Sequence, residues 1–212
     1  MRSIFFVFAL LLTGLAGLNA QGLKVIKLDA PDKTRGTAVM KALADRHSER
    51  AFTNKPLSHK DLSDLLWAAN GINRPDGKRT AASAMNKQDV DVYVILPEGA
   101  YLYDAAASEL KPVAAGDHRG LIAGGQAFVK QAPLCLLIVS DYARFGNGDT
   151  EKSKLFGAFD AGLVSQNVAI FCSACGLATV PRASMDSESL RKVLRLSATQ
   201  LPVINHPVGY PK

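Results

Sequence analysis

Two arginines with a serine between them are the residues of this chain best suited to bind an anion. Arg46 and Arg50 lie four residues apart and flank Ser48, and His47 follows the first arginine. A guanidinium presents a planar fork of donors that matches the oxygens of a phosphate, and a serine adds a short donor at the same edge. The same pattern also occurs at solvated helix ends, where basic residues interact favourably with the helix dipole. The segment is therefore a candidate phosphate site that other parts of the chain must support.

The sequence contains none of the common catalytic motifs. There is no GxGxxG, no Walker loop and no Gly-x-Ser-x-Gly elbow, and the four histidines lack the spacing of metal ligands. The chain therefore offers no obvious nucleophile and no metal centre, and any reaction that it catalyses is expected to depend on a bound cofactor.

Three cysteines are an odd number, so they cannot form a complete disulfide framework. Cys172 and Cys175 form a CxxC motif, which suggests redox chemistry or metal binding. However, the motif lies in an apolar helical run without a second cysteine pair, so we interpret both residues as buried. Cys135 is expected in the core of a strand.

The elements that must position the anion-binding segment are an irregular series of helices and strands. A helix over 38–46 leads into the segment, and a second helix is capped by Ser58 and stopped at Asn70-Gly71. Further helices are expected over 119–131, over 155–177 and from 185, and strands over 90–96, 100–104, 134–140 and 201–208. The 155–177 helix is apolar on most sides and should run through the centre. Because helices and strands do not alternate regularly, we predict an α+β fold.

Length and composition fit one globular domain. The chain has 212 residues, 48% of them hydrophobic, and its net charge of +6 is scattered along the sequence. This mild excess has no basic run interleaved with aromatic residues, so it does not indicate nucleic-acid binding. An anionic small ligand is sufficient to explain it.

The first twenty residues have the pattern of a secretory signal peptide. Arg2 gives a short positive start, an apolar run extends from Ile4 to Leu18, and Ala20 is a small residue at the cleavage site. An uncleaved N-terminal anchor is the alternative, although the run is short for a membrane span. We therefore expect a periplasmic or secreted protein that meets the membrane only during export. Residues 21–36 form a lead-in that runs along the surface or embraces a partner subunit, and residues 37–212 form the functional domain.

Several segments, in order over about residues 40–212, resemble the FMN-dependent nitroreductase superfamily. They are the run from Arg46 to Phe52, the helix that ends at Gly71, the small-residue loop from Arg79 to Gln88, and the Gly-Tyr-Pro of residues 209–211. The set is most similar to the branch that contains the SagB/ThcOx-type dehydrogenases of peptide azolines. Members often have proline after the loop glutamine, whereas this chain has Asp89.

The resemblance implies a nitroreductase-like fold, in which a mixed, mainly antiparallel sheet is flanked by helices in an intertwined homodimer that binds FMN between its subunits. The cofactor-binding residues that it implies are Arg46, Ser48, Arg50 and Lys212 for the phosphate and ribityl chain, and His47, Ser83, Asn86 and Gln88 for the flavin. These residue types suit the roles, because guanidiniums match a phosphate and a carboxamide both donates to and accepts from the ring.

Two functions are compatible with this site. The first is an exported FMN-dependent oxidoreductase that transfers hydride or electron pairs from a small-molecule donor to an organic acceptor. The second is an exported flavin-binding protein of the same fold without turnover. An exported enzyme would not meet the cytoplasmic NAD(P)H pool, so a quinol or a redox protein is an alternative donor.

Overall fold

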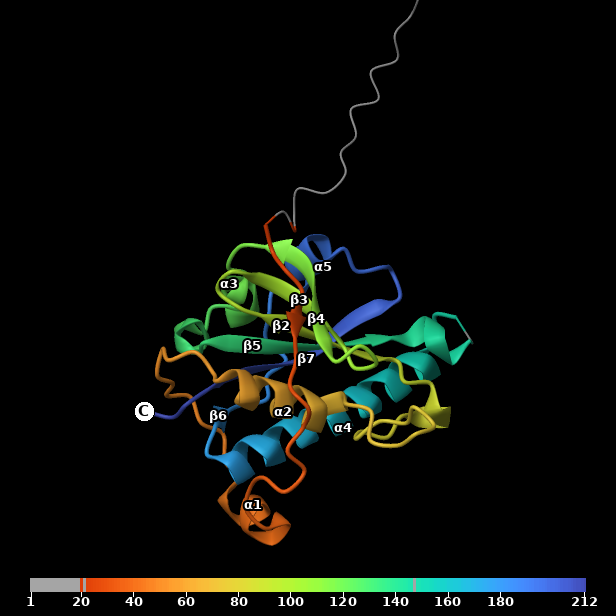
Figure 1. Ribbon diagram of the computed structural model, residues 1–212. Coiled ribbons are helices and arrows are strands. Elements are labelled where there is room, and N and C mark those ends of the chain that lie inside the picture. Colours follow the sequence, from red (N-terminus) through yellow and green to blue (C-terminus); the bar gives the residue numbers. More distant parts are fainter. Residues whose placement is uncertain (1–19, 21, 147) are drawn as a thin grey trace, which may run out of the picture.

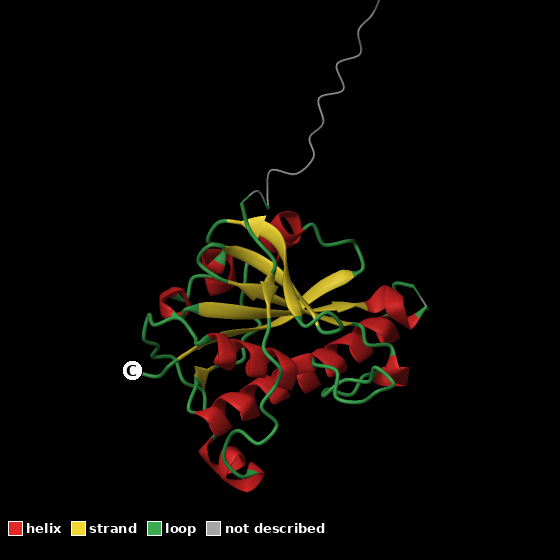
Figure 2. Ribbon diagram, viewed as in Figure 1, coloured by secondary structure: helices red, strands yellow, loops and turns green. Residues whose placement is uncertain are grey.

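The computed structural model describes residues 20, 22–146 and 148–212, so the expected signal peptide, residues 1–20, lies outside the described residues except for Ala20. Within them, one seven-stranded sheet has helices on both faces (Figure 1, Figure 2). The strands are β1 (Ile26–Lys27), β2 (Val90–Ile95), β3 (Gly99–Asp104), β4 (Glu109–Ala115), β5 (Leu134–Asp141), β6 (Ala178–Thr179) and β7 (Gln200–Gly209). The α-helices are α1 (Val39–Asp45), α2 (His59–Asn70), α3 (Arg119–Ala123), α4 (Glu151–Cys175) and α5 (Ser187–Leu194), and short 3-10 helices are η1 (Ala84–Asn86), η2 (Ala127–Gln131) and η3 (Tyr142–Phe145).

The strand order is β1-β4-β3-β2-β5-β7-β6, and each neighbouring pair is antiparallel. Strands β2, β3 and β4 are consecutive along the chain and form a meander. Between β5 and β7 the chain forms α4, the short edge strand β6 and α5. The predicted α+β fold with a mainly antiparallel sheet is therefore confirmed.

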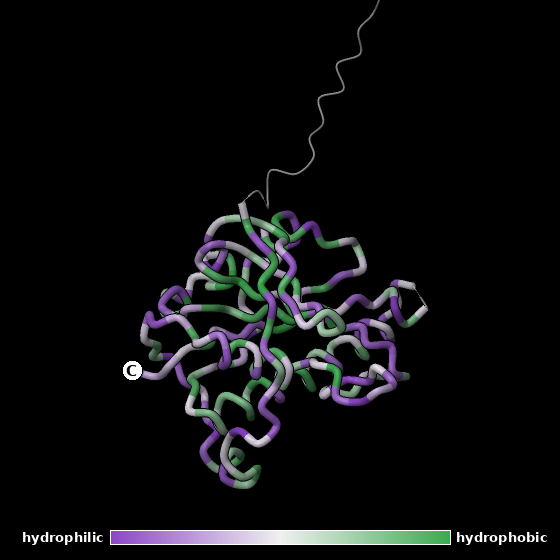
Figure 3. Tube along the Cα trace, in the orientation of Figure 1, coloured by the Kyte–Doolittle hydropathy of each residue, from purple (hydrophilic) through white to green (hydrophobic). Residues whose placement is uncertain are grey.

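The central strand β5 contributes to a core on each face of the sheet. Leu136 and Ile138 pack in the cluster that includes α2 and α4, whereas Leu137 and Val139 pack in the cluster that includes α3 and α5. The alternation arises because successive side chains of a strand point to opposite faces. Both sets are fully buried, which explains why the segment is almost continuously apolar. Figure 3 shows hydrophobic residues along the strands in the middle of the molecule.

Helix α2 begins and ends as predicted. Ser58 Oγ accepts a hydrogen bond from Asp61 N at 3.0 Å, which satisfies a free amide of the first turn. Leu65, Leu66 and Ala69 on its inner face have no exposed surface. The helix stops at Gly71, where a Cβ atom would meet the backbone of Trp67.

Helix α4 is the long central helix that the sequence predicts, but it begins four residues earlier. Thr150 Oγ1 accepts a hydrogen bond from Ser153 N at 3.1 Å and caps the helix there. The helix ends at Gly176, whose φ of 70° suits glycine. Its length and its hydropathy of 1.4 would suit a membrane span. However, α4 packs against α1, α2, β5 and β7, as the central helix of a folded domain does.

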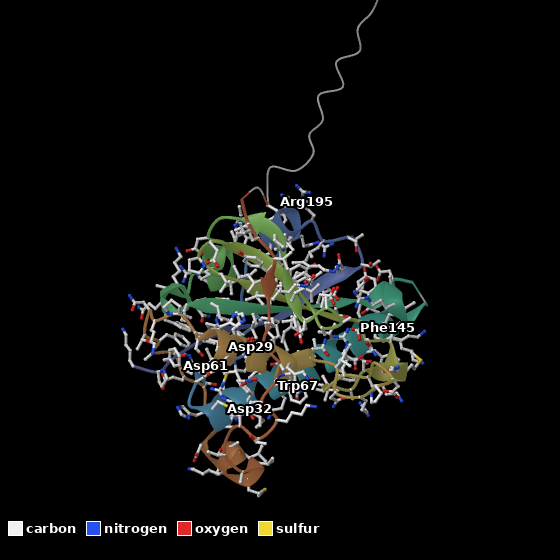
Figure 4. All side chains as sticks on the ribbon, viewed as in Figure 1. Asp29, Asp32, Asp61, Trp67, Phe145 and Arg195 are labelled. Carbon is white, nitrogen blue, oxygen red and sulfur yellow. The ribbon has the colours of Figure 1, made fainter. Side chains whose placement is uncertain are left out.

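The described part of the lead-in, residues 22–36, packs on the surface of its own domain, which is one of the two arrangements that we predicted. Asp29 N donates to Ser63 Oγ at 2.9 Å, and Arg35 forms ion pairs with both Asp61 and Asp64 of α2. Figure 4 shows Asp29 in the same region as Asp61. Further upstream, β1 pairs with the edge of β4. The lead-in therefore closes one edge of the sheet and then crosses α2.

The sequence pattern does not predict β1 or β4. Strand β4 contains Pro112, and proline disfavours a strand interior because it lacks an N–H donor. Pro112 lies beyond the end of β1, which pairs only with Glu109 and Leu110, so no hydrogen bond to that neighbour is lost. The predicted helix over 119–131 is instead divided into α3 and η2, because Gly124 and Gly125 take φ values of 53° and 86°.

Candidate functional site

The segment from Arg46 to Arg50 leaves α1 and continues in a non-helical conformation. Arg46 N still donates to Ala42 O at 3.0 Å, but the φ and ψ of Arg46, −59° and 118°, end the helix. Glu49 N then donates to Thr179 O at 3.0 Å. The segment is therefore fixed beside β6, and its side chains are displayed from a defined backbone.

The last residues of the chain lie against the same segment. Phe52 pairs with Pro211, and Lys212 N donates to Ala51 O at 3.3 Å. The backbone of Lys212 therefore lies beside Ala51, the neighbour of Arg50. Its ammonium is exposed and makes one long contact, 3.5 Å from Gln131 Oε1.

The two guanidiniums are available to a ligand. Neither Arg46 nor Arg50 forms an ion pair with a carboxylate of the described residues, and Arg50 Nη1 makes one long hydrogen bond of 3.4 Å to the carbonyl of Ser48. The carboxylate of Glu49 forms no ion pair with either guanidinium; its Oε1 instead accepts from the backbone N of Ala51 and Arg50 at 2.8 and 2.7 Å. These hydrogen bonds lower the pKa of Glu49. Two cationic forks, a serine hydroxyl and a nearby lysine fit a phosphate dianion.

His47 and Glu49 line a small cleft at the end of α4. The His47 Nδ1 atom lies 2.8 Å from Asp45 O, and the imidazole is mostly exposed. The cleft also contacts Cys172 and Thr179 and has a volume of about 160 Å³. Ligand pockets usually enclose roughly 300–1,000 Å³. This cleft by itself is therefore too small for a ligand as large as a flavin.

The loop from Ser83 to Gln88, here called the ring loop, is rigidly built. Ser83 Oγ accepts from Gln88 N at 2.9 Å, and the Gln88 carboxamide accepts from Arg79 Nε at 3.0 Å. Met85, Asn86 and Gln88 all have positive φ, at 53°, 52° and 48°. Such conformations cost free energy in residues other than glycine and concentrate at functional sites. Asn86 remains exposed, so its carboxamide can contact a ligand.

The segment from Arg46 to Arg50, here called the phosphate segment, lies near the C-terminal end of α4, whereas the ring loop contacts its N-terminal half (Figure 1). Ala84 N donates to Asp160 Oδ2 at 2.8 Å, whereas Ser173 Oγ donates to Ala42 O at 2.7 Å, beside the arginines. Asp160 and Ser173 are thirteen residues apart, or about 20 Å along a helix. A ribityl phosphate is shorter than this. One chain therefore carries Arg46, His47, Ser48 and Arg50 on one segment, with the backbone of Lys212 beside it, and Ser83, Asn86 and Gln88 in a separate loop, but it does not join the two sets.

An exposed apolar strip runs along the N-terminal half of α4. Leu155, Phe159 and Leu163 follow each other at four-residue intervals on α4, and 52%, 57% and 46% of their surfaces are exposed. These three residues are called the strip. Met85 of the ring loop and Val39, Met40 and Leu43 of α1 are further exposed apolar residues. A contiguous apolar surface of this kind indicates an interaction surface.

The comparisons with known proteins agree with this geometry. A model of the nitroreductase family matches residues 43–210. The chain belongs to the nitroreductase family. The crystal structure of a provisionally named nitroreductase from Ralstonia eutropha has 36% sequence identity and a TM-score of 0.84, and the match covers 92% of this chain and 93% of that one.

Two relatives of known sequence extend the comparison. A provisionally named nitroreductase of Methanocaldococcus jannaschii is 27% identical over 176 residues, 79% of this chain and 88% of the relative. The FMN reductase (NAD(P)H) of Bacillus subtilis is 26% identical over 187 residues, 82% of this chain and 66% of the relative. The protein is thus an FMN-dependent oxidoreductase, which confirms the predicted superfamily, cofactor and enzyme class. The roles of the individual site residues stay predictions.

Cys135 and Cys172 are buried, as predicted, whereas Cys175, which was also predicted to be buried, is half-buried near the end of α4. All three are free thiols. Burial raises the pKa of Cys135 to about 12 and also raises the pKa values of Cys172 and Cys175, so the reactive thiolate forms are disfavoured.

Sequence reasoning missed the residues that hold the ring loop from other elements. Asp160 of α4 anchors Ala84, and Arg144 Nη1 donates to Gln88 O at 2.7 Å. Neither residue belongs to a local motif. Arg144 is also paired with Asp91, so its role is visible only once η3 and β2 are side by side.

Proposed function

We propose that the protein is an exported, homodimeric oxidoreductase that binds FMN between its subunits and transfers hydride or electron pairs from a reduced donor to an organic acceptor. FMN, when bound, supplies the transfer chemistry. The observation that supports the dimeric site is the separation of two incomplete halves along one helix, which also carries an exposed apolar strip. The likeness to the SagB/ThcOx-type branch is part of the same proposal and rests on the sequence motifs alone.

A two-fold axis across α4 would complete the site. Most homodimers have such an axis, and each subunit then contributes the same surface. Two antiparallel copies of α4 that cross near Gln166, midway between Asp160 and Ser173, would cover Phe159 and Leu163 and bury their exposed apolar area. The ring loop of each subunit would then lie beside the phosphate segment of the other. Two complete sites per dimer follow.

Within each site, the residues of this chain have distinct tasks. Arg46, Ser48 and Arg50 hold the phosphate, and Lys212 adds a cation at the same end. Asn86 and Gln88 face the polar edge of the flavin. A fixed donor near that edge stabilises negative charge on the reduced cofactor and raises its potential.

The electron donor depends on the compartment. The N-terminal pattern of a signal peptide supports export to the periplasm or beyond. The relative from Bacillus subtilis has NAD(P)H in its name, but an exported protein would meet a quinol or a redox protein instead. Mass spectrometry of the protein recovered from a cell-envelope fraction tests export: a mature chain that begins at residue 21 supports it, and an intact leader in the cytoplasm contradicts it.

The purified mature protein tests the function. It is expected to be yellow, to bleach under anaerobic conditions with a suitable donor, and to recover its colour with an organic acceptor. Colour without turnover would favour the alternative, an exported flavin-binding protein. A colourless protein that FMN does not reconstitute would contradict both.

Phe159→Glu tests the dimeric site. A buried carboxylate in the middle of the strip is expected to convert the dimer to monomers and to release FMN, because each half-site alone is incomplete. Val25→Glu is the matched control, because Val25 is a similarly exposed apolar residue outside the strip. Size-exclusion chromatography with light scattering gives the mass. A Phe159→Glu protein that stays dimeric and yellow would show that the subunits meet elsewhere.

A further inference from the structure

Two buried carboxyl groups face each other beneath the ring loop. Asp89 directly follows the loop and has no exposed surface, and Asp160 of α4 is 3% exposed. Asp89 Oδ2 accepts from Ser140 Oγ at 2.5 Å, and Asp160 Oδ2 accepts from Ala84 N at 2.8 Å. The other oxygen of Asp89, Oδ1, is buried and has no hydrogen-bond donor among the described residues.

Among the described residues, neither carboxyl forms an ion pair with a cation. Arg144 of η3 belongs to the same region, but its Nη2 binds Asp91 of β2 at 2.6 Å and its Nη1 binds the Gln88 carbonyl at 2.7 Å. Arg144 also lies 3.6 Å from Asp141 of β5, so its charge is already shared by two carboxylates. Ser140, the group that β5 directs at Asp89, is neutral. Two unpaired negative charges in the core would be very costly.

A single proton resolves both problems. If one carboxyl is protonated, its O–H donates to the other, and the Asp89 Oδ1 atom gains a partner. Burial, together with the neighbouring Asp160, raises the pKa of Asp89 to about 7. Like-charged carboxyls that share a buried site commonly retain one proton between them in this way.

The carboxyl pair is also where the ring loop is held. Asp89 fixes the end of the loop and Asp160 fixes its beginning through Ala84 N. Between these points the backbone has three residues with positive φ, so it needs external support. Gly157 of α4 allows the helix to approach this closely, since a Cβ atom there would lie 3.0 Å from Ser140 Cβ and 3.5 Å from Asp89 Oδ2.

We propose that Asp89 and Asp160 share one proton and together position the ring loop, so that the affinity for FMN falls when that proton is lost. Both are positioning residues, because they act through the loop and do not line the cofactor site. Loss of the proton leaves two carboxylates that repel each other, which separates the two ends of the loop. The affinity part of this inference rests on the proposed FMN site, whereas the shared proton itself does not.

Asp89→Asn is the decisive variant. Its carboxamide oxygen can still accept from Ser140, and its NH₂ group donates permanently to Asp160 without titrating. Dissociation constants for FMN would be measured by fluorescence from about pH 5.5 to about pH 8.5, on either side of the expected titration. The phosphate of FMN titrates in this range as well, but equally for both proteins. The ratio of the two dissociation constants therefore reports only the titration of the Asp89–Asp160 pair.

The Kd of the wild-type protein is expected to rise, relative to that of Asp89→Asn, by about tenfold or more over this range, the equivalent of one pKa unit of coupling. Asp149→Asn, a substitution at an exposed carboxylate, is the matched control and should keep the wild-type profile. A constant ratio between wild type and Asp89→Asn would overturn the proposal. If Asp89→Asn does not fold, Asp160→Asn is the substitute variant, because its NH₂ group donates to Asp89 and forms the same hydrogen bond in the opposite direction.

Infrared spectroscopy of the apoprotein separates this inference from the proposed function. The wild type should show the C=O stretch of a protonated, buried carboxyl at neutral pH, and Asp89→Asn should lack it. Hydrogen exchange at the Ala84 amide, corrected for its intrinsic pH dependence, should accelerate with pH only in the wild type. Absence of the infrared band would overturn the shared proton even if FMN binds. A wild-type protein that shows the band but never binds FMN would contradict the proposed function alone.

Discussion

The phosphate segment makes a quantitative prediction about FMN affinity. Replacing Arg46 or Arg50 with alanine removes charged hydrogen bonds, each worth about 1.5–3 kcal/mol. Because about 1.4 kcal/mol is tenfold in a dissociation constant, each substitution should weaken FMN binding by roughly 10- to 150-fold. Arg46 is half-buried and Arg50 is exposed. Solvent screens the exposed guanidinium more strongly, so we place Arg50→Ala near the lower value and Arg46→Ala near the upper one.

Fluorescence titration of the apoprotein with FMN measures these constants directly, since flavin emission changes on binding. The two single variants and the double variant would be compared at low and high salt, where the losses should shrink with ionic strength. Arg195→Asn is the matched control. Arg195 lies at the far end of the molecule from Asp61 and α2 (Figure 4), and asparagine tolerates its positive φ of 54°.

The result that would refute the reasoning is an unchanged FMN affinity in both Arg46→Ala and Arg50→Ala. The phosphate would then bind elsewhere, and the absence of carboxylate partners around these guanidiniums would have a different cause. A loss of the same size in Arg195→Asn would instead point to a general effect of net charge. Thermal unfolding of each apoprotein separates a loss of affinity from a loss of fold.

Three further predictions concern the scaffold. Gly157→Ala should lower the free energy of unfolding by about 1–3 kcal/mol, because its Cβ would press on Ser140, and the added substitution Ser140→Ala should restore part of the loss in chemical denaturation. Arg35→Gln should lower stability at neutral pH by about 1–3 kcal/mol. Its two partners are Asp61 and Asp64. Burial raises their pKa values, but the hydrogen bonds that they accept outweigh this effect, so both pKa values are lowered. Their stabilisation is therefore present above about pH 4 and lost as the pH falls through the depressed values, so the two proteins should converge in acid. Replacement of Cys172 and Cys175 by alanine should leave the rate of acceptor reduction unchanged, and a thiol reagent should label Cys172 only after unfolding; rapid labelling of native Cys172 would contradict its burial.

Elements with strong local signals were predictable from the sequence. The serine cap, the four-residue apolar spacing and the terminal glycine define α2, and an almost unbroken apolar run defines β5. Elements whose sequence contains a residue that disfavours the structure were not predictable. Strand β4 contains Pro112, which is tolerated only because β1 ends before it, and that arrangement cannot be read from either segment alone.

Departures from a motif were visible in the sequence, but their meaning was not. Asp89 stands where the family resemblance leads us to expect proline, and the sequence alone does not show what the aspartate does. Its partners, Ser140 and Asp160, are 51 and 71 positions further along the chain. Only the packing of α4 against the sheet places the three groups together, at a point where Gly157 permits close approach.

The sequence by itself determined which residues can bind an anion and which can face a flavin, because those properties belong to the side chains and their immediate neighbours. Arg46, Ser48 and Arg50 have donor chemistry in any fold. The tertiary structure decided where they act: it placed the backbone of Lys212 beside their segment and the ring loop against the other half of a helix of 25 residues. Distances across a fold are set by packing between distant segments, so the division of the site into two halves could be learned only from the folded chain.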